Sequence, residues 1–126
     1  MTVLLILVST VLTSSPLLEV TDTIQRGGTA VYTVSLGEET VYWITLVSLE
    51  GATDLNLAAV SEEMDFDHFM SLPYGEDFIY AMEFAVATGL TDGDESVTVS
   101  AAYSGPFYIV VHDAGHGGGE YSLTLH

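Results

Sequence analysis

Cysteine is absent from this chain of 126 residues, and basic side chains are almost absent, since Arg26 is the single arginine and there is no lysine. Without cysteine the fold has neither a disulfide framework nor a thiolate metal site. With 18 acidic residues, the formal net charge at pH 7 is −17. A basic patch cannot form on such a chain, so nucleic acid and anionic membrane surfaces are excluded as partners.

The partners that this charge allows are cations, cationic surfaces, neutral glycans and further copies of the chain. Self-association has to overcome repulsion between acidic surfaces, which salt screens over a Debye length of about 10 Å at 0.1 M and about 3 Å at 1 M. Assembly is therefore favoured by salt, by divalent ions or by strong apolar contacts. Because this balance fits a saline or extracellular habitat, we expect an extracellular or cell-surface protein.

The longest apolar stretch is residues 1–12, which carry no charge and are apolar on both alternating faces. Its aliphatic residues are Val3, Leu4, Leu5, Ile6, Leu7, Val8, Val11 and Leu12. A signal peptide requires a lysine or arginine near its start, and none follows Met1. A membrane-spanning helix needs about 20 apolar residues, and this stretch is shorter. The pattern predicts a buried β-strand, with a helix or signal remnant as the alternative. The strand either packs in its own sandwich or inserts as a donor strand into a neighbouring subunit.

The sequence divides into an apolar strand with a hinge, residues 1–16, and a single β domain, residues 17–126. The hinge is Ser14-Ser15-Pro16, where two small residues precede a fixed φ. The domain shows about nine or ten short alternating segments separated by glycine, proline and acidic turns, which predicts an all-β sandwich or barrel. Its strongest strand is Thr40–Ser48, in which Trp43 and Ile44 point to opposite faces.

Two further segments are expected to be strands. Asp65–Met70 alternates along its length. Phe78–Leu90 has both helical and alternating spacing, and we favour a strand because its neighbours are strands. We expect Trp43 and Tyr108 to lie in the core, the alternative being an exposed aromatic face that stacks on glycans.

Several segments resemble the bacterial pre-peptidase C-terminal domain. They are Thr40–Leu46 followed by Gly51, Asp65–Met70, Glu95–Val99, the Gly105–Val111 strand with the glycine loop after it, and Tyr121–Leu125. His68 and Phe69 replace the Leu-Tyr of the family's pattern, and residues 1–12 lie outside it. The resemblance covers roughly residues 17–125 and implies an antiparallel, jelly-roll-like β-sandwich, secreted or displayed on a surface. It also implies a non-catalytic domain that binds matrix, glycans or its own passenger.

Three groups of residues are candidate metal ligands. Carboxylates at two places provide the hard oxygen ligands that Ca²⁺ prefers, although neither has the spacing of an EF-hand. They are Asp65 and Asp67 with Glu62, Glu63 and His68, and Asp92 with Asp94 and Glu95. Imidazoles beside the glycine loop provide ligands for Zn²⁺ or Cu²⁺. They are His112 and His116, with Asp113 and Glu120. The alternatives are solvated acidic turns and a flexible loop with exposed histidines.

Catalytic motifs are not evident. The chain has no G-x-S-x-G elbow and no cysteine nucleophile. Asp65 and Asp67 are close enough in sequence to suggest a pair of glycosidase carboxylates. On a strand, however, both would lie on one face near the surface, where such pairs are more often structural. We therefore expect no enzyme and no certain cofactor, with Ca²⁺ as the one considered.

The sequence most favours a structural subunit of an extracellular, pilus-like filament. Its subunits would join by donor-strand exchange, each apolar N-terminal strand completing the sheet of a neighbouring copy. The partners are therefore further copies of the chain. One alternative is a secreted module that binds glycan, matrix or Ca²⁺. The other is a structural protein of a virion or a surface layer.

Overall fold

The computed structural model describes residues 17–37, 41–49, 54–90, 94–100 and 105–126. The helices in these ranges are α1 (Phe66–Ser71) and α2 (Glu76–Met82). The strands are β1 (Leu18–Ile24), β2 (Thr29–Leu36), β3 (Val41–Ser48), β4 (Leu55–Ser61), β5 (Ala85–Gly89), β6 (Glu95–Ser100), β7 (Gly105–Asp113) and β8 (Gly119–Leu125). No helix among these residues is long and apolar enough to cross a membrane.

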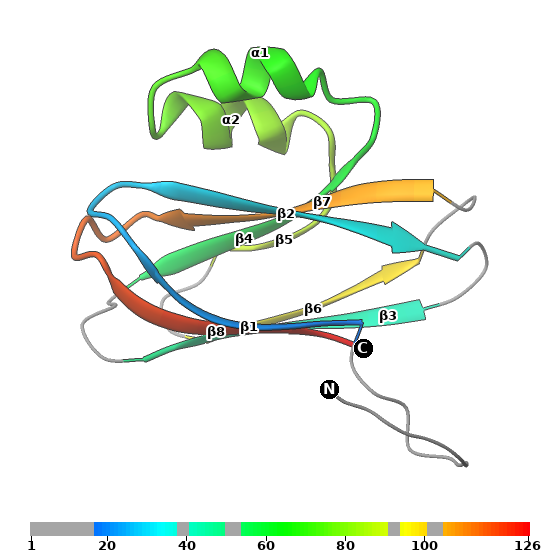
Figure 1. Cartoon of the computed structure of the whole chain (residues 1–126), viewed down its shortest axis with the longest axis horizontal. Coiled ribbons are helices and arrows are strands. Elements are labelled where there is room, and N and C mark those ends of the chain that lie inside the picture. Colours follow the sequence, from blue (N-terminus) through cyan, green and yellow to red (C-terminus); the bar gives the residue numbers. More distant parts are fainter. Residues whose placement is uncertain (1–16, 38–40, 50–53, 91–93, 101–104) are drawn as a thin grey trace.

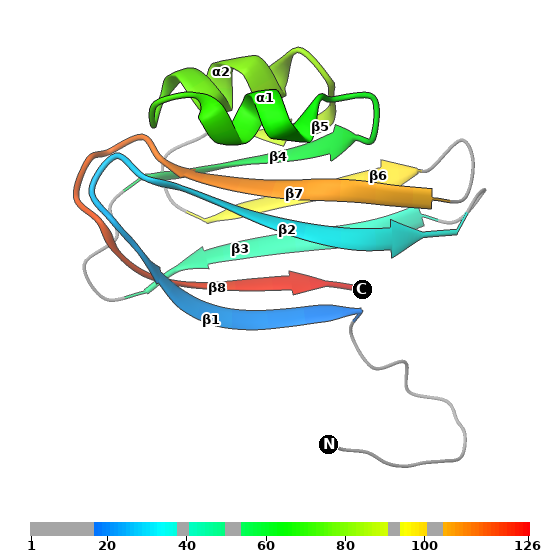
Figure 2. The ribbon, with the colours of Figure 1, turned by 45° about the horizontal axis from the view of Figure 1, so that its top comes forward.

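The strands form two four-stranded sheets that pack face to face (Figure 1). Sheet A has the order β1-β8-β3-β6, and sheet B has the order β2-β7-β4-β5. All the pairings are antiparallel. The expectation of an all-β antiparallel sandwich is therefore confirmed, and Figure 2 shows its two sheets one above the other with the helices on top.

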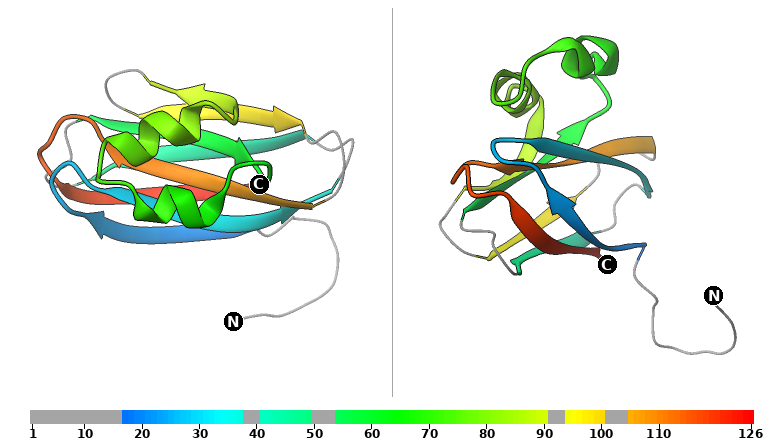
Figure 3. Two further views of the ribbon diagram at one scale, coloured as in Figure 1. Left: turned by 90° about the horizontal axis from the view of Figure 1, so that it is seen from above. Right: turned by 60° about the vertical axis from the view of Figure 1, so that its left-hand side comes forward.

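The chain changes sheet at almost every connection. Strands that follow one another in sequence lie in opposite sheets, except β4 and β5, which are neighbours in sheet B. The connection between β4 and β5 contains both helices. Because β4 and β5 lie in the same sheet, this connection does not cross from one sheet to the other. The helices lie instead across the outer face of sheet B, as the view from above in Figure 3 shows.

A main core fills the space between the sheets. Alternate residues of each strand point inward, and Ile44, Leu57 and Leu123 are completely buried there. The Tyr32 and Tyr121 hydroxyl groups hydrogen-bond to each other between the sheets. Burial raises the pKa of both phenols, so both stay protonated at neutral pH.

A second core lies between sheet B and the two helices. Phe69 of α1 and Phe78 of α2 are buried there against Ala58, Val60 and Val110 of β4 and β7. Ring contacts extend it, because Phe66 stacks on Tyr108 with ring centroids 5.2 Å apart. Tyr108, expected in the core, is partly buried and packs against this second core. The central strands of sheet B are thus covered on both faces.

The expected strand over Asp65–Met70 is wrong, because this segment is mostly helix α1. Asp65 is its N-cap, and the carboxylate accepts a hydrogen bond from the backbone N–H of His68 at 3.1 Å. The helical spacing of Phe66 and Phe69 turns both rings toward sheet B. Met70, by contrast, is 60% exposed.

The expected strand over Phe78–Leu90 is wrong in its first half. Residues up to Met82 belong to α2, and the strand begins only at Ala85. The helix follows Gly75, whose φ of 96° is a conformation that residues with a side chain rarely adopt. Helical spacing then buries Phe78 and Ala81 on one side, so contact with sheet B decided between the two periodicities.

Candidate functional site

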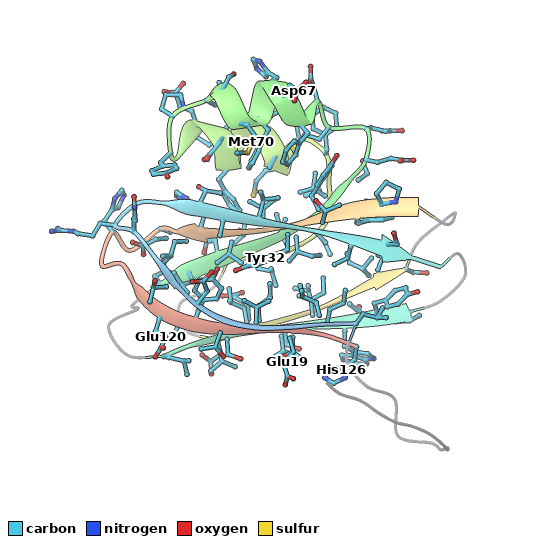
Figure 4. The ribbon with its side chains drawn as sticks, in the orientation of Figure 1. Glu19, Tyr32, Asp67, Met70, Glu120 and His126 are labelled. Atoms are coloured by element: carbon cyan, nitrogen blue, oxygen red, sulfur yellow. The ribbon has the colours of Figure 1, made fainter. Side chains whose placement is uncertain are left out.

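The two outer faces of the sandwich differ. The helices cover sheet B, whereas in the described structure no element lies over sheet A (Figure 3). Glu19, Glu120 and His126 lie on the side of sheet A that faces away from Tyr32 and the helices (Figure 4). This side, which we call the open face, is therefore the surface on which to look for a binding site.

The open face is built from alternate residues of β1, β8, β3 and β6, and most of its side chains are Ser or Thr. They are Glu19, Thr21, Thr23, Val41, Trp43, Thr45, Val47, Ser96, Thr98, Ser100, Glu120, Ser122 and Thr124. Its two carboxylates belong to β1 and β8, so the half formed by β3 and β6 is uncharged. For a protein with a net charge of −17, this half is an unusually neutral surface.

Trp43 is the main aromatic group of the open face. It is 57% exposed, as is Val41 two residues earlier, so the expectation that Trp43 lies in the core is wrong. The strand is fixed by neighbours on both sides, since Trp43 pairs with Thr98 of β6 and exchanges backbone hydrogen bonds with His126 at 2.9 and 3.0 Å. A rigid backbone thus presents an indole among hydroxyl groups.

An indole surrounded by hydroxyl groups suits a ligand that has both an apolar surface and polar groups. Exposed indoles attract flat apolar surfaces and keep one polar N–H, which is why tryptophan is enriched at binding surfaces. The neighbouring Ser and Thr hydroxyls both donate and accept hydrogen bonds. A sugar ring combines C–H groups on its faces with hydroxyls at its edge, so it matches both features.

A buried polar network lies on the other side of the molecule, between α2 and sheet B. The Thr29 hydroxyl on β2 donates to the Asp77 carboxylate at 2.9 Å and lies 2.9 Å from Nδ1 of His112 on β7. Asp77 is 5% and His112 is 8% exposed. Phe78 stacks on the imidazole with ring centroids 5.1 Å apart, so the network fixes α2 to the sheet.

A hydroxyl, an imidazole and a carboxylate are also the three groups of a hydrolytic triad, but here they are hydrogen-bonded in a different order. A triad needs the imidazole between hydroxyl and carboxylate, so that it takes the proton of the nucleophile. Here the Thr29 hydroxyl lies between His112 and Asp77 and gives its proton to the carboxylate. His112 Nδ1 is then the donor to Thr29. The geometry therefore describes a structural network and not a nucleophile with its base.

His112 is held as a neutral imidazole. Burial lowers its pKa below the ordinary value of 6.5, and the nearby Asp77 carboxylate opposes this shift only in part. Because the ring is fixed by Thr29 and Phe78, it cannot swing out to solvent without breaking these contacts. The low pKa is thus a property of the folded state and couples stability to pH.

The glycine loop after β7 is tied down at several points. Asp113 is fully buried, and its Oδ2 accepts hydrogen bonds from the backbone N–H groups of Gly27 at 2.9 Å and Gly118 at 2.7 Å. The Arg26 side chain donates to the carbonyl oxygen of His116 at 3.1 Å. These bonds join the β1–β2 turn to the β7–β8 turn, so Asp113 has a structural partner set of its own.

The candidate metal ligands are dispersed over the fold. Asp65 caps α1, Asp67 is exposed on that helix, and Asp94 accepts a hydrogen bond from the Ser48 N–H at 3.0 Å. Glu95 is buried and His116 is exposed. Among the described residues, no three His, Asp or Glu side chains gather as a metal site would require.

Two sequence predictions cannot be located. Asp92 and the apolar segment, with Val3, Leu4, Leu5, Ile6, Leu7, Val8, Val11 and Leu12, lie outside the described residues. The Ca²⁺ ligands and the donor strand therefore stay predictions. What the sequence prediction missed is the role of Thr29 and Asp77, which are 48 residues apart and share no local motif.

The fold has a known counterpart. The chain is similar to the pre-peptidase C-terminal domain of a collagenase from Bacillus anthracis. The crystal structure of that domain has a resolution of 1.0 Å. The TM-score is 0.57 at 17% identity, covering 86% of this chain and 88% of that one. This likeness shows a pre-peptidase C-terminal-like β-sandwich fold. No family model and no curated protein matches the sequence.

Replacing Thr29 by valine tests the buried network. The change keeps the shape but removes the hydroxyl between two buried polar groups, so the free energy of unfolding should fall by about 1–3 kcal/mol. Urea unfolding followed by circular dichroism measures this loss. Thr98→Val, at an exposed position of the open face, is the matched control and should change stability by less than about 0.5 kcal/mol. Equal stabilities of the two variants would contradict the network.

The pH dependence of stability tests the state of His112. Because its pKa is lowered in the folded protein, its contribution is complete above about pH 6.5 and is lost as the pH falls through the folded pKa. Between about pH 7.5 and about pH 5.5 the wild type should therefore lose more stability than His112→Gln. The carboxylates and the other histidines titrate in both proteins and cancel in the comparison. Parallel pH profiles would rule out a lowered pKa at His112.

Proposed function

We propose that this protein is a non-catalytic binding module that attaches to a neutral glycan polymer through the open face of sheet A. In this proposal it works outside the cell, either secreted or displayed on a surface. The observation that carries the proposal is Trp43, 57% exposed on a sheet face that no other element of the described residues covers. An indole exposed beside Val41 and among Ser and Thr hydroxyls offers both stacking and hydrogen bonding, which favours a binding role.

The charge distribution supports a neutral ligand. An anionic polymer would be repelled by a chain with 18 acidic residues and one arginine. A cationic polymer would prefer the acidic surfaces elsewhere to the uncharged strip of β3 and β6. A neutral polysaccharide loses little from the overall charge, and it gains stacking on Trp43 and hydrogen bonds to neighbours such as Thr98 and Ser96.

The shape of the face supports a polymer over a small free sugar. The open face is the outside of a sheet and not a concave pocket, so a single sugar would bury little of its surface. Strands β3 and β6 extend the contact along their length, and a chain of several rings could lie across them. Affinity for one ring should accordingly be weak, and affinity for a chain should rise with its length.

Replacing Trp43 by alanine tests this function. Affinity electrophoresis in gels containing soluble β-glucan, xylan or mannan, with pull-down on insoluble cellulose and chitin, should show retention of the wild type on at least one of these polymers. Trp43→Ala should weaken that retention about ten-fold or more, because one buried aromatic contact is worth at least about 1.4 kcal/mol.

The matched control for this variant is Tyr74→Ala, since Tyr74 is 60% exposed beside the helices on the opposite side of the molecule. It should bind as the wild type does. Retention by none of the five polymers would contradict the glycan proposal, and so would an equal effect of the two substitutions.

A second candidate function is the filament subunit joined by donor-strand exchange. The described strands already form two four-stranded sheets around a buried core, so that core is accounted for without the apolar segment. Eight buried aliphatic side chains would contribute on the order of 12–24 kcal/mol before ordering costs. The proposal is that residues 3–12 are free to leave their own sandwich and add as a strand to a sheet of another copy.

Removal of residues 1–12 tests the filament. The truncated protein should sediment as a monomer at high salt, where the wild type should form filaments visible by negative-stain electron microscopy. The double variant Leu5→Asp and Leu7→Asp keeps the chain length and should also stay monomeric, because it places charge in the apolar strand. Filaments formed by the truncated protein would refute donor-strand exchange.

A further inference from the structure

A cavity of about 320 Å³ opens at the end of the sandwich where β4 ends and β7 begins. The turn from α2 into β5 forms another part of its wall. Its lining includes Ser61, Glu63, Glu83, Phe84, Val86 and Phe107. The position is fixed by backbone, since the Ser61 N–H donates to the Phe84 carbonyl oxygen at 3.1 Å. The cavity is thus part of the fold, because the end of β4, the turn from α2 into β5, the end of β6 at Ser100 and the start of β7 all line it.

The lining combines two kinds of surface. Phe84 and Phe107 contribute aromatic rings and Val86 an aliphatic side chain, while Glu63 and Glu83 add carboxylates that are both exposed. A metal ion of the calcium type would want six or more oxygen ligands, which a partly aromatic wall does not supply. A purely apolar ligand would contact the rings and make no use of the two carboxylates. The lining therefore calls for one group that is apolar along its length and positive at its end.

The chain cannot supply this positive group itself. Its single lysine or arginine side chain, Arg26, lies at the opposite end of β7 and donates to the carbonyl oxygen of His116. A second copy brings the same single arginine, held in the same way. The charge on the two carboxylates is thus available to a different protein.

We propose that this cavity receives a lysine or arginine side chain of a partner protein. The methylene stem would lie against Phe84 and Val86, as long cationic side chains do when they cover apolar surface. The head would reach Glu63 and Glu83 and form charge-assisted hydrogen bonds. Aromatic rings at the wall add cation–π attraction, which is strongest for arginine. The volume, at the lower limit of ligand pockets, fits one side chain.

This inference is independent of the glycan proposal. It uses Glu63 and Glu83 at one end of the sandwich, whereas glycan binding uses Trp43 on the open face. A protein could lose either activity and keep the other. Together the two would let the module hold a polymer on one surface and a basic protein at another.

A titration of the full chain, labelled with ¹⁵N, tests the cavity. The probes are acetyl-Gly-Arg-Gly-amide and its lysine counterpart, and the neutral comparison is the same peptide with citrulline, which keeps the shape of arginine without its charge. The two cationic peptides should cause saturable shifts that concentrate on the amides of Ser61, Phe84 and Val86. The affinity for the citrulline peptide should be lower by about five-fold or more.

A pair of charge-matched variants completes the test. Glu63→Gln with Glu83→Gln should weaken the arginine peptide about five-fold or more. Glu19→Gln with Asp67→Asn removes the same charge at exposed positions elsewhere and should leave affinity within about two-fold. Equal weakening by both pairs, shifts spread over the acidic surface, equal binding of citrulline or no saturable shifts would each overturn the proposal, whatever the result with Trp43→Ala.

Discussion

The antiparallel pair β4–β7 supports the whole structure, because both faces of this pair are buried. Leu57 of β4 and Val111 of β7 lie opposite each other and point into the main core. Ala58 and Val110, one residue along, lie opposite each other and point into the second core beneath the helices. The sandwich and the helical layer therefore share one pair of strands, and a shift of one residue would exchange their faces.

This double burial also explains where binding can occur. Helices α1 and α2 cover the outer face of sheet B, so a ligand cannot reach its central strands from that side. Sheet A keeps its outer face uncovered in the described structure, with alternating small polar side chains around one indole. The division between a covered and an uncovered sheet arises from the connection between β4 and β5, the place where the chain stays within one sheet.

The sandwich could be predicted from alternation and turn spacing, and the resemblance to the pre-peptidase C-terminal domain gave the correct fold. The helices were missed because the segments are short, and six or seven residues fit either period. One signal was available, since β4 and β7 are apolar on both alternating faces, as strands covered on both sides are. Trp43 was placed in the core because Thr40–Ser48 is aromatic or aliphatic on both faces, and only pairing with β6 and β8 decides which faces inward.

The site residues were less predictable for a different reason. His112 looked like a metal ligand beside a glycine loop, and its true partners, Thr29 and Asp77, come from another strand and a helix. The exposed Trp43 and the carboxylates of Glu63 and Glu83 likewise gain meaning only from neighbours distant in sequence. Short-range patterns determine strands well, whereas these environments are properties of the assembled sheets.

The place of β8 within sheet A has a consequence for the order of events during synthesis. This last strand lies between β1 and β3, and Leu18 at the start of β1 is paired with Leu125. Neither neighbour has its β8 hydrogen bonds until the final described residues have left the ribosome. Such long-range closure makes folding slow. Sheet A therefore cannot close around β8 until this strand has been made, so the sandwich is completed only after β1 to β7 have been synthesised.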